Sequence, residues 1–143
     1  MVSQSVVRLL GYGGTIPFLC GGILVTCDVR LPGIEVPTAL LYYGAIILSF
    51  LGGLHWGRVA STANHSRPSD TAFLVWSVVP PLIAWGALLM GQSAGVIVMI
   101  GCFCSAYIID RRLYVAGEWQ GWMHSLRRNL TAVACVSLAT ILL

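Results

Sequence analysis

Residues 42–58 read YYGAIILSFLGGLHWGR, and this stretch decides the fold. It is apolar enough to cross a bilayer, for which a helix needs about 20 mostly apolar residues. It also carries two tyrosines, a serine and three glycines ahead of the closing His-Trp-Gly-Arg. A helix that only anchors a protein in lipid needs none of these groups. We therefore interpret the stretch as a central membrane helix around which the rest of the chain packs.

The composition excludes an ordinary soluble domain. Of the 143 residues, 57% are hydrophobic and only 9% are charged, whereas soluble domains carry about 25% charged residues. The hydrophilic stretches are too short to fold separately, so residues 1–143 are expected to form a single helical membrane domain. The net charge of +3 comes with no basic cluster interleaved with aromatic residues, so no nucleic-acid partner is predicted.

The long apolar blocks predict an all-α membrane protein with five transmembrane helices. The expected spans are about 9–27, 38–56, 71–90, 94–109 and 123–143. Pro17 lies within the first span, and the pair Pro80-Pro81 is expected to kink or locally break the third. Residues 113–129 are aromatic and basic together, which is typical of an interfacial segment.

The arginines predict the orientation. With five spans, the N-terminus, the loop at 58–70 and the segment at 110–129 lie on one side of the membrane. That side holds Arg8, Arg58, Arg67, Arg111, Arg112, Arg127 and Arg128, and the other side holds Arg30 alone. By the positive-inside rule, the N-terminus is expected in the cytoplasm (or mitochondrial matrix) and the C-terminus outside.

Several motifs along the chain resemble a known family. They are Leu10-Gly11-Tyr12-Gly13, Ile16-Pro17-Phe18, Tyr43-Gly44-Ala45, Ser49-Phe50-Leu51-Gly52-Gly53 with His55-Trp56-Gly57, Trp76, Pro80, Ala84-Trp85, Tyr107 and Asp110-Arg111-Arg112. The family is the domain-of-unknown-function family numbered 3429, which is related to eukaryotic transmembrane protein 69. The resemblance implies a bacterial inner (cytoplasmic) membrane or, alternatively, a mitochondrial inner membrane. It implies no reaction.

One candidate polar cluster lies at the arginine-side ends of the second and fourth spans. Its members are His55, Trp56, Arg58, Tyr107, Asp110 and Arg111. Because both helices run toward the same side, His55 and Asp110 are expected at one depth, where they could orient the imidazole, hold a proton or bind a polar headgroup. The alternative is that they are interfacial residues paired with arginines, serving only topology and packing.

Other hypotheses concern a ligand within the bundle. A membrane haem normally needs two deep histidines, but His65 lies in a polar loop and His124 in the interfacial segment. Tyr42 and Ser49 beside Trp76 and Trp85 could line a quinone or lipid cleft. No cofactor and no metal are predicted, with quinone, lipid or haem kept as alternatives.

The small residues on these helices have a simpler interpretation, which is packing of one helix against another. Close approach of helix backbones in lipid is favoured by small side chains. The expected packing residues are Gly11, Gly14, Ala45, Ser49 and Gly52.

No catalytic motif is present, so an enzyme is not favoured. We therefore predict a small polytopic inner-membrane protein that is a non-catalytic accessory or assembly subunit of an energy-converting membrane complex. Its expected partners are the lipid bilayer and either other membrane subunits or further copies of itself. The alternative is a membrane-embedded protein that binds quinone, lipid or haem at the His55 and Asp110 helix ends.

Overall fold

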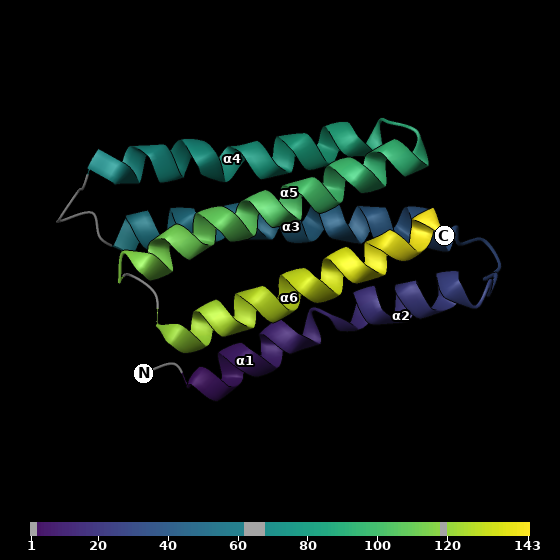
Figure 1. The fold of residues 1–143 in the computed structure, drawn as a ribbon, viewed down its shortest axis with the longest axis horizontal. Helices are drawn as coiled ribbons and strands as arrows, with labels where there is room; N and C mark the ends of the chain where they lie inside the picture. The colour runs from purple at the N-terminus through teal and green to yellow at the C-terminus, as the bar shows by residue number, and fades with distance from the viewer. Residues whose placement is uncertain (1–2, 62–67, 118–119) are drawn as a thin grey trace.

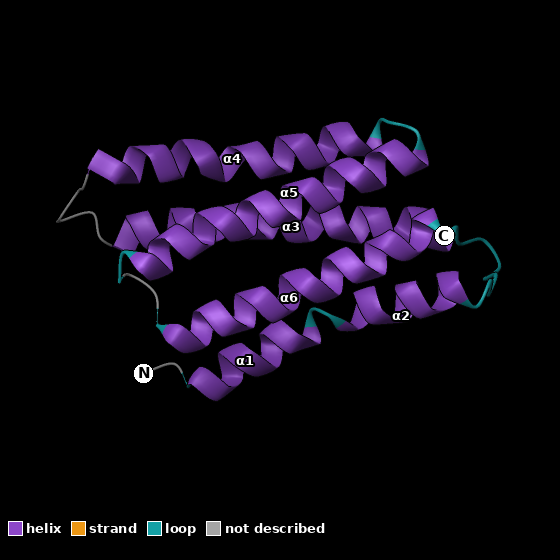
Figure 2. Ribbon diagram, viewed as in Figure 1, coloured by secondary structure: helices purple, strands orange, loops and turns teal. Residues whose placement is uncertain are grey.

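The computed structural model describes residues 3–61, 68–117 and 120–143, and its regular structure there is helical apart from one isolated bridge between Leu31 and Ile34. Figures 1 and 2 show an elongated bundle of helices. The helices are α1 (Gln4–Gly13), α2 (Ile16–Thr26), α3 (Val36–Ser61), α4 (Pro68–Leu88), α5 (Gln92–Val115) and α6 (Gly121–Ala139), followed by the short 3-10 helix η2 (Thr140–Leu142).

The helices run alternately between two ends of the bundle. The start of α1, the end of α3, the start of α4, the end of α5 and the start of α6 lie at one end, on the left in Figure 1. The C-terminus lies at the opposite end, beside the end of α2. The arginines of the described residues therefore gather at the first end, apart from Arg30 in the α2–α3 connection.

Four segments of the described chain are long and apolar enough to cross a membrane. They are Gln4–Thr26, Val36–Ala60, Asp70–Leu88 and Gln92–Val115. The fifth predicted span is not among them, because the first half of α6 carries polar and basic residues such as His124, Arg127 and Asn129. The all-helical membrane architecture is thus supported, while the count of five spans is not.

The first span is interrupted between α1 and α2. Pro17 was expected within the first span, and it lies in the first turn of α2, where its missing N–H is not needed. The interruption falls at Gly14 and Thr15. There the Tyr43 hydroxyl of α3 donates to the Gly14 carbonyl oxygen at 2.8 Å. A side chain from the neighbouring helix therefore stabilises the junction.

Helices α3 and α4 pack so closely that the backbone of one contacts the backbone of the other. α4 remains one helix through Pro80 and Pro81 instead of breaking there. Pro81 has no N–H, so the Ser77 carbonyl loses its usual partner in the helix. This oxygen lies so close to Gly52 that a Cβ at that position would meet it at 2.2 Å. Only glycine allows this contact.

The other differences concern the ends of α3, α5 and α6: the second span was expected to end at Trp56, but α3 continues to Ser61. The fourth span was expected to end at Ile109, but α5 continues through Asp110 to Val115. The expected interfacial segment at 113–129 is instead divided between the end of α5 and the first half of α6. Two turns of helix thus bring residues 110–113 of α5 alongside the start of α6, which sets up the site described next.

Candidate functional site

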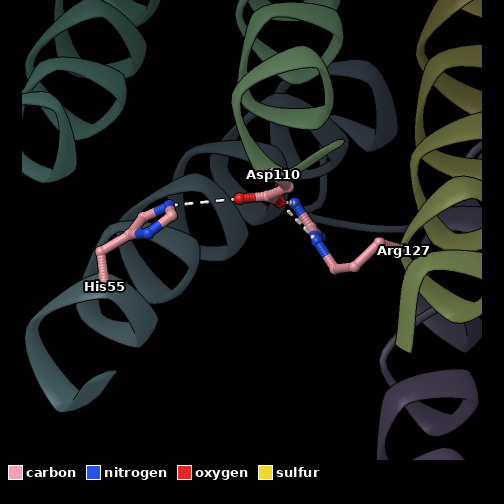
Figure 3. Close-up of polar contacts among 3 residues, drawn as sticks. All are labelled: His55, Asp110 and Arg127. Carbon is pink, nitrogen blue, oxygen red and sulfur yellow. Dashed lines mark hydrogen bonds and ion pairs between the residues drawn. The ribbon is translucent and has the colours of Figure 1, made fainter. Parts of the chain in front are cut away.

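Three buried ionisable side chains from three helices meet near the arginine-rich end of the bundle. Figure 3 shows them: His55 of α3, Asp110 of α5 and Arg127 of α6. The Nε2 of His55 lies 3.2 Å from Oδ1 of Asp110. The Nε of Arg127 donates to Oδ2 of Asp110 at 2.7 Å, and its Nη2 lies 2.5 Å from the same oxygen. We call these three residues the ionic cluster.

The ionic cluster lies inside the protein. Each of its three residues is only 4% exposed. A buried charge is tolerated when a partner of opposite charge compensates it, and removing one partner leaves the other uncompensated. Asp110 sits at the centre with one oxygen toward each neighbour. The cluster therefore ties the ends of α3, α5 and α6 together.

A second ion pair lies next to the cluster and extends it to α4. Arg58 Nη2 donates to Oδ1 of Asp70 at 3.2 Å. Phe73 of α4 lies between this ion pair and the ionic cluster. Its ring stacks on the His55 imidazole with centroids 5.7 Å apart. The Arg58 guanidinium carbon lies 4.8 Å from the centre of the same ring. The helix ends of α3, α4, α5 and α6 are thus joined through polar and aromatic contacts.

Three other residues of the predicted cluster, Tyr107, Trp56 and Arg111, lie outside the ionic cluster, while Arg58 adjoins it through Phe73. Tyr107 lies beside His124 of α6, with 3.4 Å between its hydroxyl and Nε2, and Tyr114 stacks on the same imidazole. Trp56 and Arg111 are exposed. Of the six residues, only His55 and Asp110 lie in contact within the ionic cluster.

Sequence reasoning missed Arg127, which was grouped with the interfacial arginines. Its position does carry a signal. Arg127, Thr131, Ala134 and Leu138 recur at helical spacing, and all four are buried. An arginine in line with an inward apolar stripe predicts a buried partner of opposite charge.

The predicted packing residues occupy different surroundings. Gly11 faces Leu126 and Leu130 of α6, and Gly52 faces the backbone of α4. Gly14 lies at the α1–α2 junction under Tyr43. Ala45 is half-buried and Ser49 is exposed, so these two leave part of α3 open toward the surroundings.

The remaining ligand hypotheses concern haem, a metal and a cleft between α3 and α4. His65 lies outside the described residues. Within the described part of the chain, no three His, Cys, Asp or Glu side chains gather in a way that could hold a metal ion. The cleft expected between α3 and α4 is filled at Gly52 by the Ser77 carbonyl.

A cavity of about 250 Å³ opens instead on the other side of α3. It lies between the α1–α2 junction, α3, α5 and α6, and Arg127 of the ionic cluster forms part of its wall. The ionic cluster therefore holds helix ends together through charge, and Arg127 also forms part of the wall of a largely apolar cavity.

Comparison with known proteins identifies the family. The family described as Protein of unknown function (DUF3429) matches residues 3–143. The chain belongs to this family. The resemblance drawn from the sequence motifs is thereby confirmed.

Two relatives carry the name Transmembrane protein 69. The one from Xenopus tropicalis is 37% identical over 133 residues, covering 90% of this chain and 50% of the relative. The one from Mus musculus is 27% identical over 130 residues, covering 91% of this chain and 52% of the relative. The chain thus spans about half the length of the curated relatives it matches. No solved structure matches it significantly. These names agree with a multi-pass membrane protein.

Proposed function

We propose that the protein is a non-catalytic accessory or assembly subunit of an energy-converting membrane complex. The observation that carries this proposal is an exposed strip of small residues on α3. Ser49, Gly53 and Gly57 follow one another at intervals of four residues and are all exposed. No atom of the described chain lies within 4 Å of a Cβ built at Gly53 or Gly57. We call these three residues the α3 strip.

The α3 strip is suited to another membrane helix. Small residues four apart let two helix backbones approach closely in lipid, where packing rather than the hydrophobic effect drives association. Gly52, the neighbour of Gly53, already serves this purpose toward α4 within the chain. The same helix therefore uses one small-residue face internally and leaves a second one open for a partner subunit or a second copy.

The ionic cluster supports a structural role. Both oxygens of Asp110 are engaged by His55 and Arg127, and all three residues are buried. An acid or base that acts on a substrate must reach the proton it transfers. For this reason a ligand site centred on His55 and Asp110 has less support than the subunit role.

The proposal includes a location and an orientation. We place the protein in a bacterial inner membrane, with the mitochondrial inner membrane as the alternative. The arginine-rich end, which holds the start of α1, faces the cytoplasm or matrix under the positive-inside rule. In this arrangement α6 is a fifth span, with Arg127 of its polar first half buried against Asp110 of α5, and the C-terminus lies outside.

The test is association of the full-length protein in its own membrane. Gly53→Leu places a bulky side chain on the α3 strip without meeting other atoms of the chain, so the fold should survive. Gly101→Leu is the matched control, because Gly101 of α5 is also exposed with no atom within 4 Å of its Cβ. Native mass spectrometry after extraction in mild detergent measures the assemblies.

We expect the unmodified protein and Gly101→Leu to carry additional polypeptides whose masses identify the partners. Gly53→Leu should lose most of them, because the backbones can no longer meet. A Gly53→Leu protein that keeps all its partners would show that the α3 strip is not the interface. An unmodified protein with no partner and no second copy would overturn the subunit role.

A further inference from the structure

Two cysteine side chains from different helices lie in contact at the surface of the bundle. The Sγ atoms of Cys104 of α5 and Cys135 of α6 are 4.0 Å apart, although the residues are 31 positions apart in the chain. The packing of α5 against α6 therefore brings them together. A disulfide needs its sulfur atoms about 2.05 Å apart, and each sulfur moves by rotation about one Cα–Cβ bond. These two residues, which we call the thiol pair, are thus within reach of a sulfur–sulfur bond.

The other three cysteines have different surroundings. Cys102 is buried, and its Sγ donates to the Pro80 carbonyl oxygen of α4 at 3.8 Å. Cys20 and Cys27 are exposed and lie in α2 and at its end. Seven residues of helix separate them by roughly 10 Å, which is too far for a disulfide. Contact between two sulfurs distinguishes the thiol pair from these three.

The thiol pair faces lipid. Cys104 is exposed and lies near the middle of α5, a helix of 24 residues that is long and apolar enough to cross a membrane. Exposed apolar side chains flank the pair on both helices, since Ile108 is 57% and Val136 is 68% exposed. An exposed side chain in the middle of a membrane span contacts the lipid chains. An oxidant dissolved in the lipid therefore reaches Cys104 directly.

The apolar surroundings decide which oxidation is open to the thiol pair. Attack on a peroxide in water begins with a thiolate, and an isolated charge is unfavourable in an apolar environment. Transfer of a hydrogen atom from a neutral thiol creates no charge, so lipid does not oppose it. Lipid peroxyl radicals, which form in membranes with unsaturated chains, are oxidants that accept a hydrogen atom. The location of the pair thus favours this radical route.

We propose that Cys104 and Cys135 are a modification site at which lipid peroxyl radicals close a disulfide between α5 and α6. One peroxyl radical takes the hydrogen atom of the Cys104 thiol, and a second takes that of Cys135. Each S–H bond breaks, and each radical becomes a hydroperoxide with a new O–H bond. The unpaired electrons of the two sulfurs then pair in one S–S bond. Two thiols are oxidised and two peroxyl radicals are reduced.

The disulfide adds a second connection between the same two helices. The ionic cluster already joins α5 to α6 through Asp110 and Arg127. Cys104 lies six residues before Asp110, and Cys135 lies eight residues after Arg127. At about 1.5 Å per residue, the thiol pair is roughly 9–12 Å farther from the arginine-rich end. Oxidation therefore fixes α6 against α5 at two levels. The site does not involve the α3 strip, so it does not depend on the subunit role.

The experiment uses the full-length protein in two kinds of liposome. In liposomes of dilinoleoyl phosphatidylcholine, a lipid-soluble azo initiator generates peroxyl radicals within the bilayer. In liposomes of a saturated phosphatidylcholine, hydrogen peroxide is added to the water and no lipid peroxyl radical forms. Digestion without reductant, followed by mass spectrometry, measures the fraction of Cys104 linked to Cys135. Reduction of the same digest with a phosphine confirms the bond.

Two variants accompany the unmodified protein. Cys135→Ser removes the second thiol while keeping the size of the side chain, so no disulfide can close. Cys104 should then carry sulfinic or sulfonic acid instead, the next products of cysteine oxidation. Cys20→Ser is the matched control, because Cys20 is exposed on α2 and lies outside the thiol pair. It should leave the linked fraction unchanged.

We expect the lipid-soluble initiator to link Cys104 to Cys135 in most molecules. Hydrogen peroxide in saturated lipid should link about tenfold fewer, because a neutral thiol is a poor nucleophile.

Three results would overturn the proposal. The first is an unlinked thiol pair after radical treatment, while circular dichroism shows an intact helical fold. The second is equal linkage by hydrogen peroxide in saturated lipid, since the oxidant would then not be a lipid radical. The third is that Cys20 is linked to other cysteines as often as Cys104 is to Cys135, since the reaction would then not depend on contact between the sulfurs.

Discussion

The two sides of α3 pack in opposite ways. Toward α4, the helix presents Gly52, and the backbone of α4 lies directly against it at the Ser77 carbonyl. Toward α1, α2 and α6, it presents Ile47 and Leu51 to a cavity of about 250 Å³. On this second side Leu48 packs in the apolar core with Phe18 and Phe103, and a charged contact from His55 to Asp110 is added at the end of the helix.

The difference is between close backbone packing on one side of α3 and looser side-chain packing on the other. Where backbones touch, no volume remains and every added atom must displace the helix. Where side chains of unequal length meet around the α1–α2 junction, a cavity remains beside the apolar core. On the first side an added atom has no room, and on the second side a cavity of about 250 Å³ leaves room for one. Three substitutions test this comparison.

Loss of the ionic cluster should have the largest effect. Asp110→Ala leaves the Arg127 guanidinium buried without its carboxylate, so the free energy of unfolding should fall by about 3–5 kcal/mol. Thermal unfolding in detergent, followed by circular dichroism, measures the change.

Two further variants show whether charge is the cause. Arg30→Gln breaks only an exposed pair with Asp28, at 3.9 Å, and should leave the melting temperature unchanged. Replacing Asp110 by Leu and Arg127 by Met together removes both charges, and should recover most of the stability. If this double variant is as unstable as Asp110→Ala, the loss comes from packing and not from an uncompensated charge.

The close approach of α3 and α4 should be the next most sensitive feature. A Cβ at Gly52 would meet the Ser77 carbonyl oxygen at 2.2 Å, so Gly52→Ala should destabilise the protein by about 1–3 kcal/mol, as overpacking does. Gly53→Ala is the matched control one residue along the same helix, with no atom within 4 Å. It should be neutral or more stable by up to about 1 kcal/mol, because alanine favours helix. Equal melting temperatures for the two variants would mean that the helices do not touch at Gly52.

The same substitution on the cavity side should have the smallest effect. At Gly11 of α1, which lines the cavity, a Cβ would meet leucine side-chain tips, the nearest being Leu126 Cδ2 at 3.2 Å. The tip of a leucine side chain can rotate away, so Gly11→Ala should change the free energy of unfolding by less than about 1 kcal/mol. The measurement is the same thermal unfolding series. A loss as large as that of Gly52→Ala would mean that the cavity wall at Gly11 is packed as tightly as the contact between α3 and α4.

The sequence by itself determined the class of protein and its family. Long apolar blocks with 9% charged residues leave no soluble alternative, because an apolar surface of that extent needs lipid around it. The segments that qualify as spans fall where four of the five blocks were predicted. The sequence also predicted that His55 and Asp110 lie at the same depth in the membrane, because both are near the arginine-side ends of their helices.

Only the tertiary structure decided which faces meet. Membrane helices such as α3 and α5 are apolar all round, so hydrophobic periodicity does not indicate the inward face as it does in a soluble protein. For this reason the contact of Gly52 with Ser77 and the cavity on the opposite side were not predictable. The ion-pair partner of Asp110 could not be predicted for a related reason. Arg127 resembles its neighbours in an interfacial basic run, and it becomes a buried ion-pair partner only because α6 turns it toward α5, 17 residues away along the chain.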